Sequence, residues 1–409
     1  MPMLNPQTHE PVTVEELSTL FSEECSRQEL NMTDRWIEIP EVVREKYTYY
    51  RSTPLVRAYG LEEALGTPAH IYFKNESVSP IGSHKLNSAL PQAYYCKQEG
   101  VTNVTTETGA GQWGAALAYA AKVFDLESAV YQVKISYEQK PYRKSIMQVF
   151  GALVTPSPSM STRAGKDILT RTPNHQGSLG TAISEAVELA RMTPGCKYTL
   201  GSVMSHVSLH QTIIGLEAEK QMEMAGEYPD VVIGCFGGGS NFSGIAFPFM
   251  RHNFAGTRNT EFLAAEPASC PKLTQGTFDY DFGDEAGYTP LMPMYTLGHD
   301  FQPSNIHAGG LRYHGAGVIV SQLLKDGYMK AVDIDQVESS ESFLSLDGGR
   351  VALKPGNYER WIDRLELSDA QFALDFYDWL EANIDGALVD PTECPTYKGN
   401  YVYMAKVNT

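Results

Sequence analysis

The sequence has no long apolar run and no cluster of basic residues. Its 409 residues include 32 Lys and Arg against 49 Asp and Glu, a net charge of −17. Nucleic-acid binding requires clustered positive charge to neutralise phosphates, so we expect no nucleic-acid partner. A membrane-spanning helix needs about 18 consecutive apolar residues, so we expect no membrane span. The first 31 residues are polar and acidic, and they do not have the pattern of a signal peptide.

The sequence also has no closely spaced cysteine pair. Its six cysteines lie far apart without a CxxC motif. This usage is typical of reduced, mostly buried thiols and predicts a cytoplasmic protein. With 42% hydrophobic and 20% charged residues, the chain is too apolar to be disordered, and its length suits about two domains.

Short β-branched or apolar runs alternate with helix-like segments in the middle of the chain. Predicted strands occupy residues 101–106, 128–135, 153–155 and 230–236, and a single helix is predicted over 207–225, ending at Gly226. This alternation predicts an α/β fold with a parallel sheet. Residues 278–317 show no clear period, and we interpret them as irregular functional loops.

Lys85 lies in the segment SPIGSHKLN (residues 79–87), directly after a Pro, Gly and Ser turn that opens an apolar stretch. A helix start disfavours the ammonium form and lowers the pKa of the amine. A neutral amine is what a Schiff-base lysine needs to attack an aldehyde. The alternative is a solvated surface lysine.

The segment FGGGSN (residues 236–241) lies between a predicted buried strand and an amphipathic helix. Glycines at such a turn allow backbone N–H groups to surround an anion at the helix N-terminus. The segment has neither the P-loop lysine nor the GxGxxG spacing of a dinucleotide site. It therefore predicts a site for one phosphate, with a flexible turn as the alternative.

The segment ETGAGQWG (residues 107–114) is a second strand-to-helix glycine turn. Its N–H groups are candidates for binding a substrate carboxylate, and Glu107 beside them is a candidate general acid/base. The alternative role for Glu107 is an N-cap or first-turn carboxylate.

Three histidines, His299, His307 and His314, recur in the region without a clear period. Their spacing matches no zinc pattern, so we predict no metal site and interpret them as residues that order loops or the mouth of a site.

An amine suited to a Schiff base, a phosphate loop and a carboxylate cradle together predict a pyridoxal 5'-phosphate site for an amino acid. The segments that carry these features, and others, closely resemble the tryptophan synthase β-chain family, in its longer second branch. The resemblance runs from about Arg51 to Val332 and includes SPIGSHKLNSAL, TETGAGQWG, GSVMSHVSLHQTIIGLEA, PDVVIGCFGGGSNFSGIAFPF, EPASCP and IHAGGLRYHG.

The resemblance implies a role for each site residue. Lys85 would form the Schiff base and move the substrate α-proton, and Glu107 would protonate the leaving hydroxyl. Gln112 would lie near the phenolic oxygen of the cofactor. Implied cofactor-binding residues are His84, Lys85, Gln112, Gly237, Gly238, Gly239, Ser240 and Asn241. Implied substrate-binding residues are Thr108, Gly109, Ala110, Gly111 and Gln112.

The resemblance also implies the fold, a fold-type II pyridoxal-phosphate enzyme with two three-layer α/β domains and the cofactor in the cleft between them. We predict an N-terminal extension over 1–52 that packs on the C-terminal domain. An N-terminal domain over 53–215 would carry the lysine and a mobile part that closes over the substrate, and a C-terminal domain over 216–409 would carry the phosphate loop.

The tail from about residue 335 departs from the family pattern. The family's Ser-Gly-His-Gly motif, whose serine faces the pyridine nitrogen, is absent. Residues 401–407 have the composition of a strand, which would place Asn408 or Thr409 near that nitrogen. A surface strand at a fraying terminus is the alternative.

The implied reaction is β-replacement, in which L-serine and indole give L-tryptophan. Two alternatives stay open: a relative that uses the aminoacrylate with another nucleophile or deaminates serine or threonine, and a non-catalytic homologue with a replaced tail. The resemblance further implies a homodimer and weak contact with a tryptophan synthase α subunit.

Overall fold

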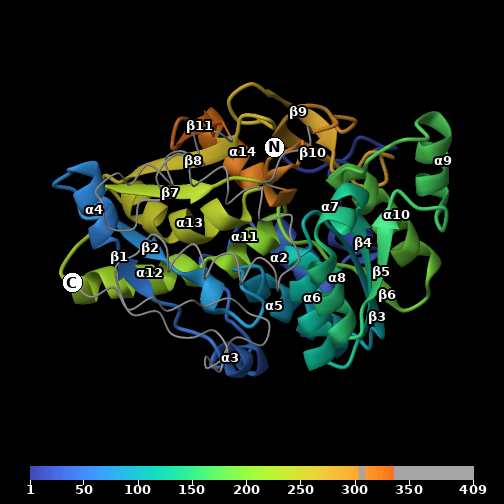
Figure 1. The fold of residues 1–409 in the computed structure, drawn as a ribbon, viewed down its shortest axis with the longest axis horizontal. Helices are drawn as coiled ribbons and strands as arrows, with labels where there is room; N and C mark the ends of the chain where they lie inside the picture. The colour runs from blue at the N-terminus through green and yellow to red at the C-terminus, as the bar shows by residue number, and fades with distance from the viewer. Residues whose placement is uncertain (304–308, 336–409) are drawn as a thin grey trace, which may run out of the picture. The chain divides into compact units, whose positions relative to one another are not determined.

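The computed structural model describes residues 1–303 and 309–335 of the chain (Figure 1). Of these, residues 1–58, 70–303 and 309–335 belong to one compact unit, which contains Lys85, Glu107 and the glycine loop. Of a second unit, the structure describes residues 59–69, which carry α4 (Tyr59–Leu65). The predicted strand over 401–407, Asn408 and Thr409 lie outside the described residues.

The first sheet has four parallel strands in the order β5-β4-β3-β6. Helices α6 (Gln112–Val123) and α8 (Pro141–Val149) lie on one side of it, and α10 (Leu179–Met192) lies on the other (Figure 1). Parallel strands end at a common edge, so the loops after β3 and β4 meet there. The strands are β3 (Asn103–Thr108), β4 (Glu127–Val133), β5 (Leu153–Ser157) and β6 (Cys196–Tyr198).

The second sheet has three parallel strands in the order β11-β8-β7. Helix α13 (Ser240–Phe254) follows β7 and packs on it, and α12 (Ile213–Ala225) packs on α13. The strands are β7 (Val231–Cys235), β8 (Glu261–Pro267) and β11 (Lys330–Ile334). Two parallel sheets with helices confirm the predicted α/β fold class.

The remaining elements connect or cover these sheets. They are α1 (Val14–Ser18), α2 (Glu23–Leu30), α3 (Glu41–Tyr47), β1 (Leu55–Arg57), β2 (Tyr72–Lys74), η1 (Glu76–Val78), α5 (Leu86–Gln98), α7 (Lys134–Gln139), α9 (Arg163–Arg171), α11 (Ser205–Gln211), β9 (Thr277–Phe282), β10 (Leu291–Thr296), η2 (Gly309–Leu311) and α14 (Val318–Lys325).

Two sequence-based expectations are wrong in detail. Residues 278–317 are not uniformly irregular, because β9 and β10 form an antiparallel pair in which Phe282 faces Leu291. The alternation of aromatic and acidic residues in FDYDF is a strand signal that we overlooked. The predicted helix over 207–225 is two helices, α11 and α12, which meet at Thr212.

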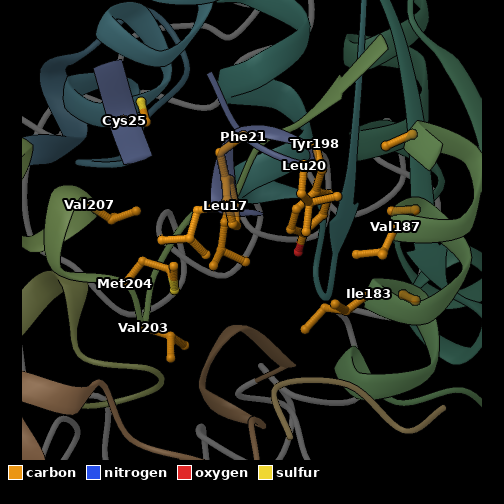
Figure 2. Packing of buried hydrophobic residues seen from close by; sticks show 14 of the residues in the cluster. Leu17, Leu20, Phe21, Cys25, Ile183, Val187, Tyr198, Val203, Met204 and Val207 are labelled. Atoms are coloured by element: carbon orange, nitrogen blue, oxygen red, sulfur yellow. The ribbon is translucent and has the colours of Figure 1, made fainter. Parts of the chain in front are cut away.

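The N-terminal segment is part of the core beside the first sheet. Figure 2 shows Leu17, Leu20 and Phe21 close to Tyr198, with Val207 of α11 and Val187 of α10 in the same cluster. Leu4 forms an isolated antiparallel bridge with Leu291 of β10. The division into 1–52, 53–215 and 216–409 stays a prediction, although the two parallel sheets fall on either side of residue 216.

Within residues 1–303 and 309–335, no helix combines the length and apolar character needed to cross a membrane.

Candidate active site

The glycine loop joins β7 to the N-terminus of α13. Gly239 has φ of +121°, a conformation that favours glycine. A Cβ on Gly238 would lie 2.3 Å from Ser202 Oγ, and one on Gly237 would lie 3.0 Å from Gly310 O. At Gly237 and Gly238 the loop backbone therefore lies so close to other segments of the same protein that there is no room for a side chain. The glycine requirement at 238 therefore has a cause within the protein, the side chains of Ser202 and Val203, whereas close approach to an anion stays a prediction.

His84 connects the lysine segment to this loop. Its Nε2 lies 3.1 Å from Ser240 Oγ, the first residue of α13. Burial lowers the pKa of His84 to about 3, and the positive charge of Lys85 acts in the same direction. The imidazole is therefore neutral at neutral pH and contributes hydrogen bonding rather than charge. Two segments that are 156 residues apart in sequence meet here, as the phosphate-site prediction requires.

Lys85 directly precedes α5 and is half-buried. Its Nζ donates a hydrogen bond to Gly201 O at 3.1 Å. Burial lowers the pKa of Lys85 to about 8, while negative charge at Glu107 and Cys235 acts in the opposite direction. We expected the helix terminus to depress this pKa, whereas in the structure the cause of the depression is burial. An appreciable fraction of the amine is neutral near pH 8, which a Schiff-base lysine needs.

Glu107 is the next-to-last residue of β3 and is 5% exposed. Burial raises the pKa of Glu107 to about 7, although a hydrogen bond from Tyr198 acts against this rise. The N-cap of α6 is Gly111, and the first turn of α6 has no acidic residue. The alternative role as a helix-capping carboxylate is therefore wrong, because Glu107 still belongs to the strand.

The predicted carboxylate cradle, residues 108–112, follows Glu107 at the end of β3. Thr108 is buried and its Oγ1 accepts a hydrogen bond from Gly114 N at 3.1 Å. Gly111 has φ of +97°, and a Cβ there would lie 2.6 Å from Arg143 Cβ. Gly109, Ala110 and Gln112 are half-buried. Thr108 and Gly111 are therefore tightly packed against protein, while Gly109, Ala110 and Gln112 remain partly accessible.

Gly201 and Ser202 bring the parts of the site together. Gly201 O accepts from Lys85, and Ser202 packs against Gly238. An amine of lowered pKa thus lies in the same small region as a glycine loop that opens a 15-residue helix. Such a loop and helix start suit one phosphate, and the amine suits an aldehyde. The residues present therefore fit pyridoxal phosphate.

Comparison with known proteins gives the family. Residues 47–349 match the family of pyridoxal-phosphate dependent enzymes. The chain is 55% identical to tryptophan synthase beta chain 2 of Thermotoga maritima over 350 residues, 85% of this chain and 82% of the relative. It is 56% identical to the Aquifex aeolicus protein of the same name over 348 residues, 84% of this chain and 80% of the relative. The chain belongs to the tryptophan synthase beta chain family.

Solved structures with low sequence identity share the fold of this chain. The fungal L-serine ammonia-lyase from Rhizomucor miehei has a TM-score of 0.51 at 16% identity, and the match covers 71% of this chain and 78% of that one. Maize serine racemase has a TM-score of 0.51 at 17% identity, and the match covers 81% of this chain and 86% of that one. These likenesses confirm fold-type II architecture and, at such identity, nothing finer.

Two of the three recurring histidines, His299 and His314, contact strand β9 of the β9–β10 hairpin. His299 Nδ1 is 2.7 Å from Asp281 Oδ1, and His314 Nε2 is 2.9 Å from Phe282 O. Both contacts order the hairpin. His307 lies outside the described residues. Among the residues that the structure describes, no three His, Cys, Asp or Glu side chains form a group suited to a metal ion.

Sequence reasoning missed two residues of the site. Cys235 ends β7, has an exposed side chain, and is close enough to Lys85 to influence its pKa. Its position directly before the glycine loop could have identified Cys235 as a site residue from the sequence. Tyr198 contacts Glu107 from β6. A strand of three residues shows no measurable period, so nothing in the sequence distinguished Tyr198 from other core tyrosines.

Proposed function

We propose that this chain catalyses β-replacement, forming L-tryptophan from L-serine and indole with pyridoxal phosphate. The observation that carries the proposal is the pairing of Glu107 with Lys85. A buried carboxyl group with a pKa of about 7 lies within electrostatic reach of an amine with a pKa of about 8. Both groups can gain and lose protons near neutral pH, as a sequence of elimination and addition requires.

The phosphate of the cofactor would be held by the glycine loop, with His84 beside it. We assign this role to His84, Gly237, Gly238, Gly239, Ser240 and Asn241. Gln112, at the first position of α6, would contact the cofactor ring. When bound, pyridoxal phosphate supplies the electron sink that makes the substrate α-proton acidic.

Lys85 would hold the cofactor and then move the proton at the substrate α-carbon through Nζ. Its lowered pKa serves both tasks, because the neutral amine is a nucleophile and a base. The contact with Gly201 O restricts where Nζ can lie.

Glu107 would donate a proton to the serine hydroxyl as it leaves and would then orient the indole. A carboxyl group with its usual pKa near 4.5 is almost fully ionised at pH 7 and is a poor acid there. Burial removes this obstacle by raising the pKa. The turn over 108–112, which directly follows Glu107, would bind the substrate carboxylate through its N–H groups.

Product analysis tests the proposal. The holoenzyme with L-serine and indole should form L-tryptophan, and Glu107→Gln should lower that rate by about 10²–10⁴-fold, the usual contribution of a general acid/base. Glu127→Gln, at an exposed position in β4, is the matched control and should behave as wild type. Release of pyruvate and ammonia without tryptophan would indicate a deaminase instead.

Assembly and location are part of the same proposal. We propose a homodimer in the cytoplasm with weak contact to a tryptophan synthase α subunit. Membership of the beta chain family and the cysteine usage of the sequence support this. Size-exclusion chromatography with light scattering, with and without an α subunit, tests the assembly.

A further inference from the structure

Tyr198 has no role in the function proposed above, yet its side chain reaches the acid/base group. In the parallel pairing of β3 with β6, Tyr198 is opposite Thr105. Side chains alternate along a strand, so Thr105 and Glu107 lie on the same face of the sheet. The long side chain of Tyr198 extends along this face, and its Oη donates a hydrogen bond of 2.5 Å to Glu107 Oε2.

Thr106 also approaches this carboxylate, but its single hydroxyl proton is donated to Thr199 O at 2.6 Å. Thr106 Oγ1 is 3.4 Å from Glu107 Oε2 and accepts a hydrogen bond from Trp113 Nε1 at 2.6 Å. Within residues 1–303 and 309–335, Tyr198 is therefore the side-chain donor to Glu107, at Oε2, and no side-chain donor reaches Oε1. One oxygen of Glu107 is held by protein, and the other is left for the substrate.

The N-terminal segment in turn holds Tyr198. The backbone N–H of Tyr198 donates to Leu20 O at 2.8 Å. Its ring lies 5.6 Å from the ring of Phe21, centroid to centroid, and both belong to the cluster in Figure 2. Tyr198 is 1% exposed, so its hydroxyl has little freedom to leave Glu107.

We propose that Tyr198 is a positioning residue, which holds one oxygen of Glu107 so that the other faces the leaving hydroxyl of the substrate. The N-terminal segment at Leu20 and Phe21 fixes Tyr198 for this role. The proposal rests on the acid/base function proposed for Glu107 and adds the residue that orients it.

The groups around Glu107 determine in which direction its pKa should change when the Tyr198 hydroxyl is removed. The titratable groups that face it are Lys85 from the start of α5, Tyr198 from β6 and Tyr313 from the segment after η2. Burial keeps the pKa of Tyr198 well above its usual value, so Tyr198 remains a donor at neutral pH. Its hydrogen bond stabilises the carboxylate form, and loss of that bond should raise the pKa of Glu107 further.

The test uses Tyr198→Phe in the holoenzyme, which removes the hydroxyl and keeps the ring against Phe21. We expect kcat for tryptophan formation to fall about tenfold with little change in KM for serine, since a hydrogen bond to a charged group is lost. The titration midpoint of Glu107 should rise by about one pH unit. Infrared spectra of the ¹³C-labelled carboxyl without substrate measure this midpoint, with Glu107→Gln assigning the band.

Tyr95→Phe is the matched control, because Tyr95 is also buried and its hydroxyl accepts a hydrogen bond from Gln28 Nε2. It should leave the Glu107 midpoint unchanged. If Tyr198→Phe folds poorly, 3-fluorotyrosine at position 198 keeps the fold and supplies a more acidic donor, which should lower the midpoint. An unchanged midpoint and rate in both position-198 proteins, while Glu107→Gln is inactive, would overturn the role of Tyr198. An active Glu107→Gln would instead overturn the acid/base function itself.

Discussion

Lys85 and Glu107 are the two residues whose protonation decides the proposed chemistry, and burial moves the pKa of each toward neutrality. The amine falls to about 8 and the carboxyl rises to about 7. Each charged form partly stabilises the other, so the two groups are linked in their titration.

Lys85 should be the residue that binds the cofactor covalently. Borohydride reduction followed by peptide mapping should label Lys85. Lys85→Ala should retain cofactor through the glycine loop but lose proton transfer at the α-carbon. Lys74→Ala, which removes a largely buried lysine that contacts Glu217, is the control and should keep the label on Lys85. A label on a different lysine in the wild type would refute the assignment.

The activity should depend on pH because of Glu107. Its raised pKa means that the carboxyl is protonated below about pH 7 and ionised above it. Elimination of the hydroxyl needs the protonated form, so its single-turnover rate should fall as the pH rises through about 7. Rapid-mixing measurements from about pH 6 to about pH 9 would bracket this midpoint. A rate for Glu107→Gln with the same pH dependence would show that another group is responsible.

At the scale of elements, the site depends on how α5, which begins directly after Lys85, is held against α12. The segment that carries Lys85 is linked to α12 through buried polar contacts. Arg51 donates to Glu217 on α12 at 2.7 Å and to Asn87 on α5 at 2.7 Å. It also pairs with Glu76 at 3.1 Å. Arg51 therefore fixes the beginning of α5, where Lys85 lies, against α12.

Replacing Gly238 should disturb the loop and thereby cofactor binding. Gly238→Ala places a Cβ against Ser202 and Val203, which forces the loop backbone outward. The affinity for pyridoxal phosphate, measured by absorbance titration, should fall. Gly226→Ala is the control, because Gly226 has φ of +70° with open space around its Cβ position. That variant should lose stability but keep its cofactor affinity, and equal affinities in the two variants would contradict the assigned loop.

Removing Arg51 should destabilise the protein strongly. The Arg51 side chain is 4% exposed, and its loss leaves Glu76 and Glu217 without this cation. Breaking a buried pair in this way costs about 3–5 kcal/mol, so Arg51→Met should lower the free energy of unfolding by that order. Lys220→Met removes an exposed pair with Glu223 and should change it by less than about 1 kcal/mol. Denaturant unfolding of both variants gives the comparison.

At the scale of the whole molecule, the N-terminal segment is tied to residues far along the chain. Glu29 on α2 accepts hydrogen bonds from the backbone N–H of His206 at 2.9 Å and of Ser205 at 3.0 Å, and its Oε2 lies 2.8 Å from His206 Nδ1. Burial alone would raise the pKa of Glu29, but these contacts with α11 hold it below its usual value.

Acid should therefore weaken this attachment. A carboxyl whose pKa is lowered in the folded state contributes stability above its unfolded pKa of about 4.5, and the contribution is lost as the pH falls below that value. The free energy of unfolding should decrease from about pH 5 downward. Glu29→Gln should be less stable at neutral pH and should lose less on acidification. Parallel acid dependence in the variant and the wild type would assign the effect to other carboxylates.

The local sequence determined four strands of the two parallel sheets, β3, β4, β5 and β7, and the residue types from which the site is proposed. Gly-rich turns after β3 and β7 were visible because glycine is required wherever backbone must adopt positive φ or approach other backbone closely. Lys85, Glu107 and the glycine loop were selected on this basis, and comparison places the chain in the family that the motifs predicted.

Only the tertiary structure decided which residues shift the pKa values of Lys85 and Glu107. The pKa values of Lys85 and Glu107 depend on burial, and burial depends on chain segments that are distant in sequence. Tyr198 meets Glu107 across 91 residues, and His84 meets Ser240 across 156. Such contacts leave no periodic or local trace in the sequence, because they arise from strand order and register and not from the propensity of either segment.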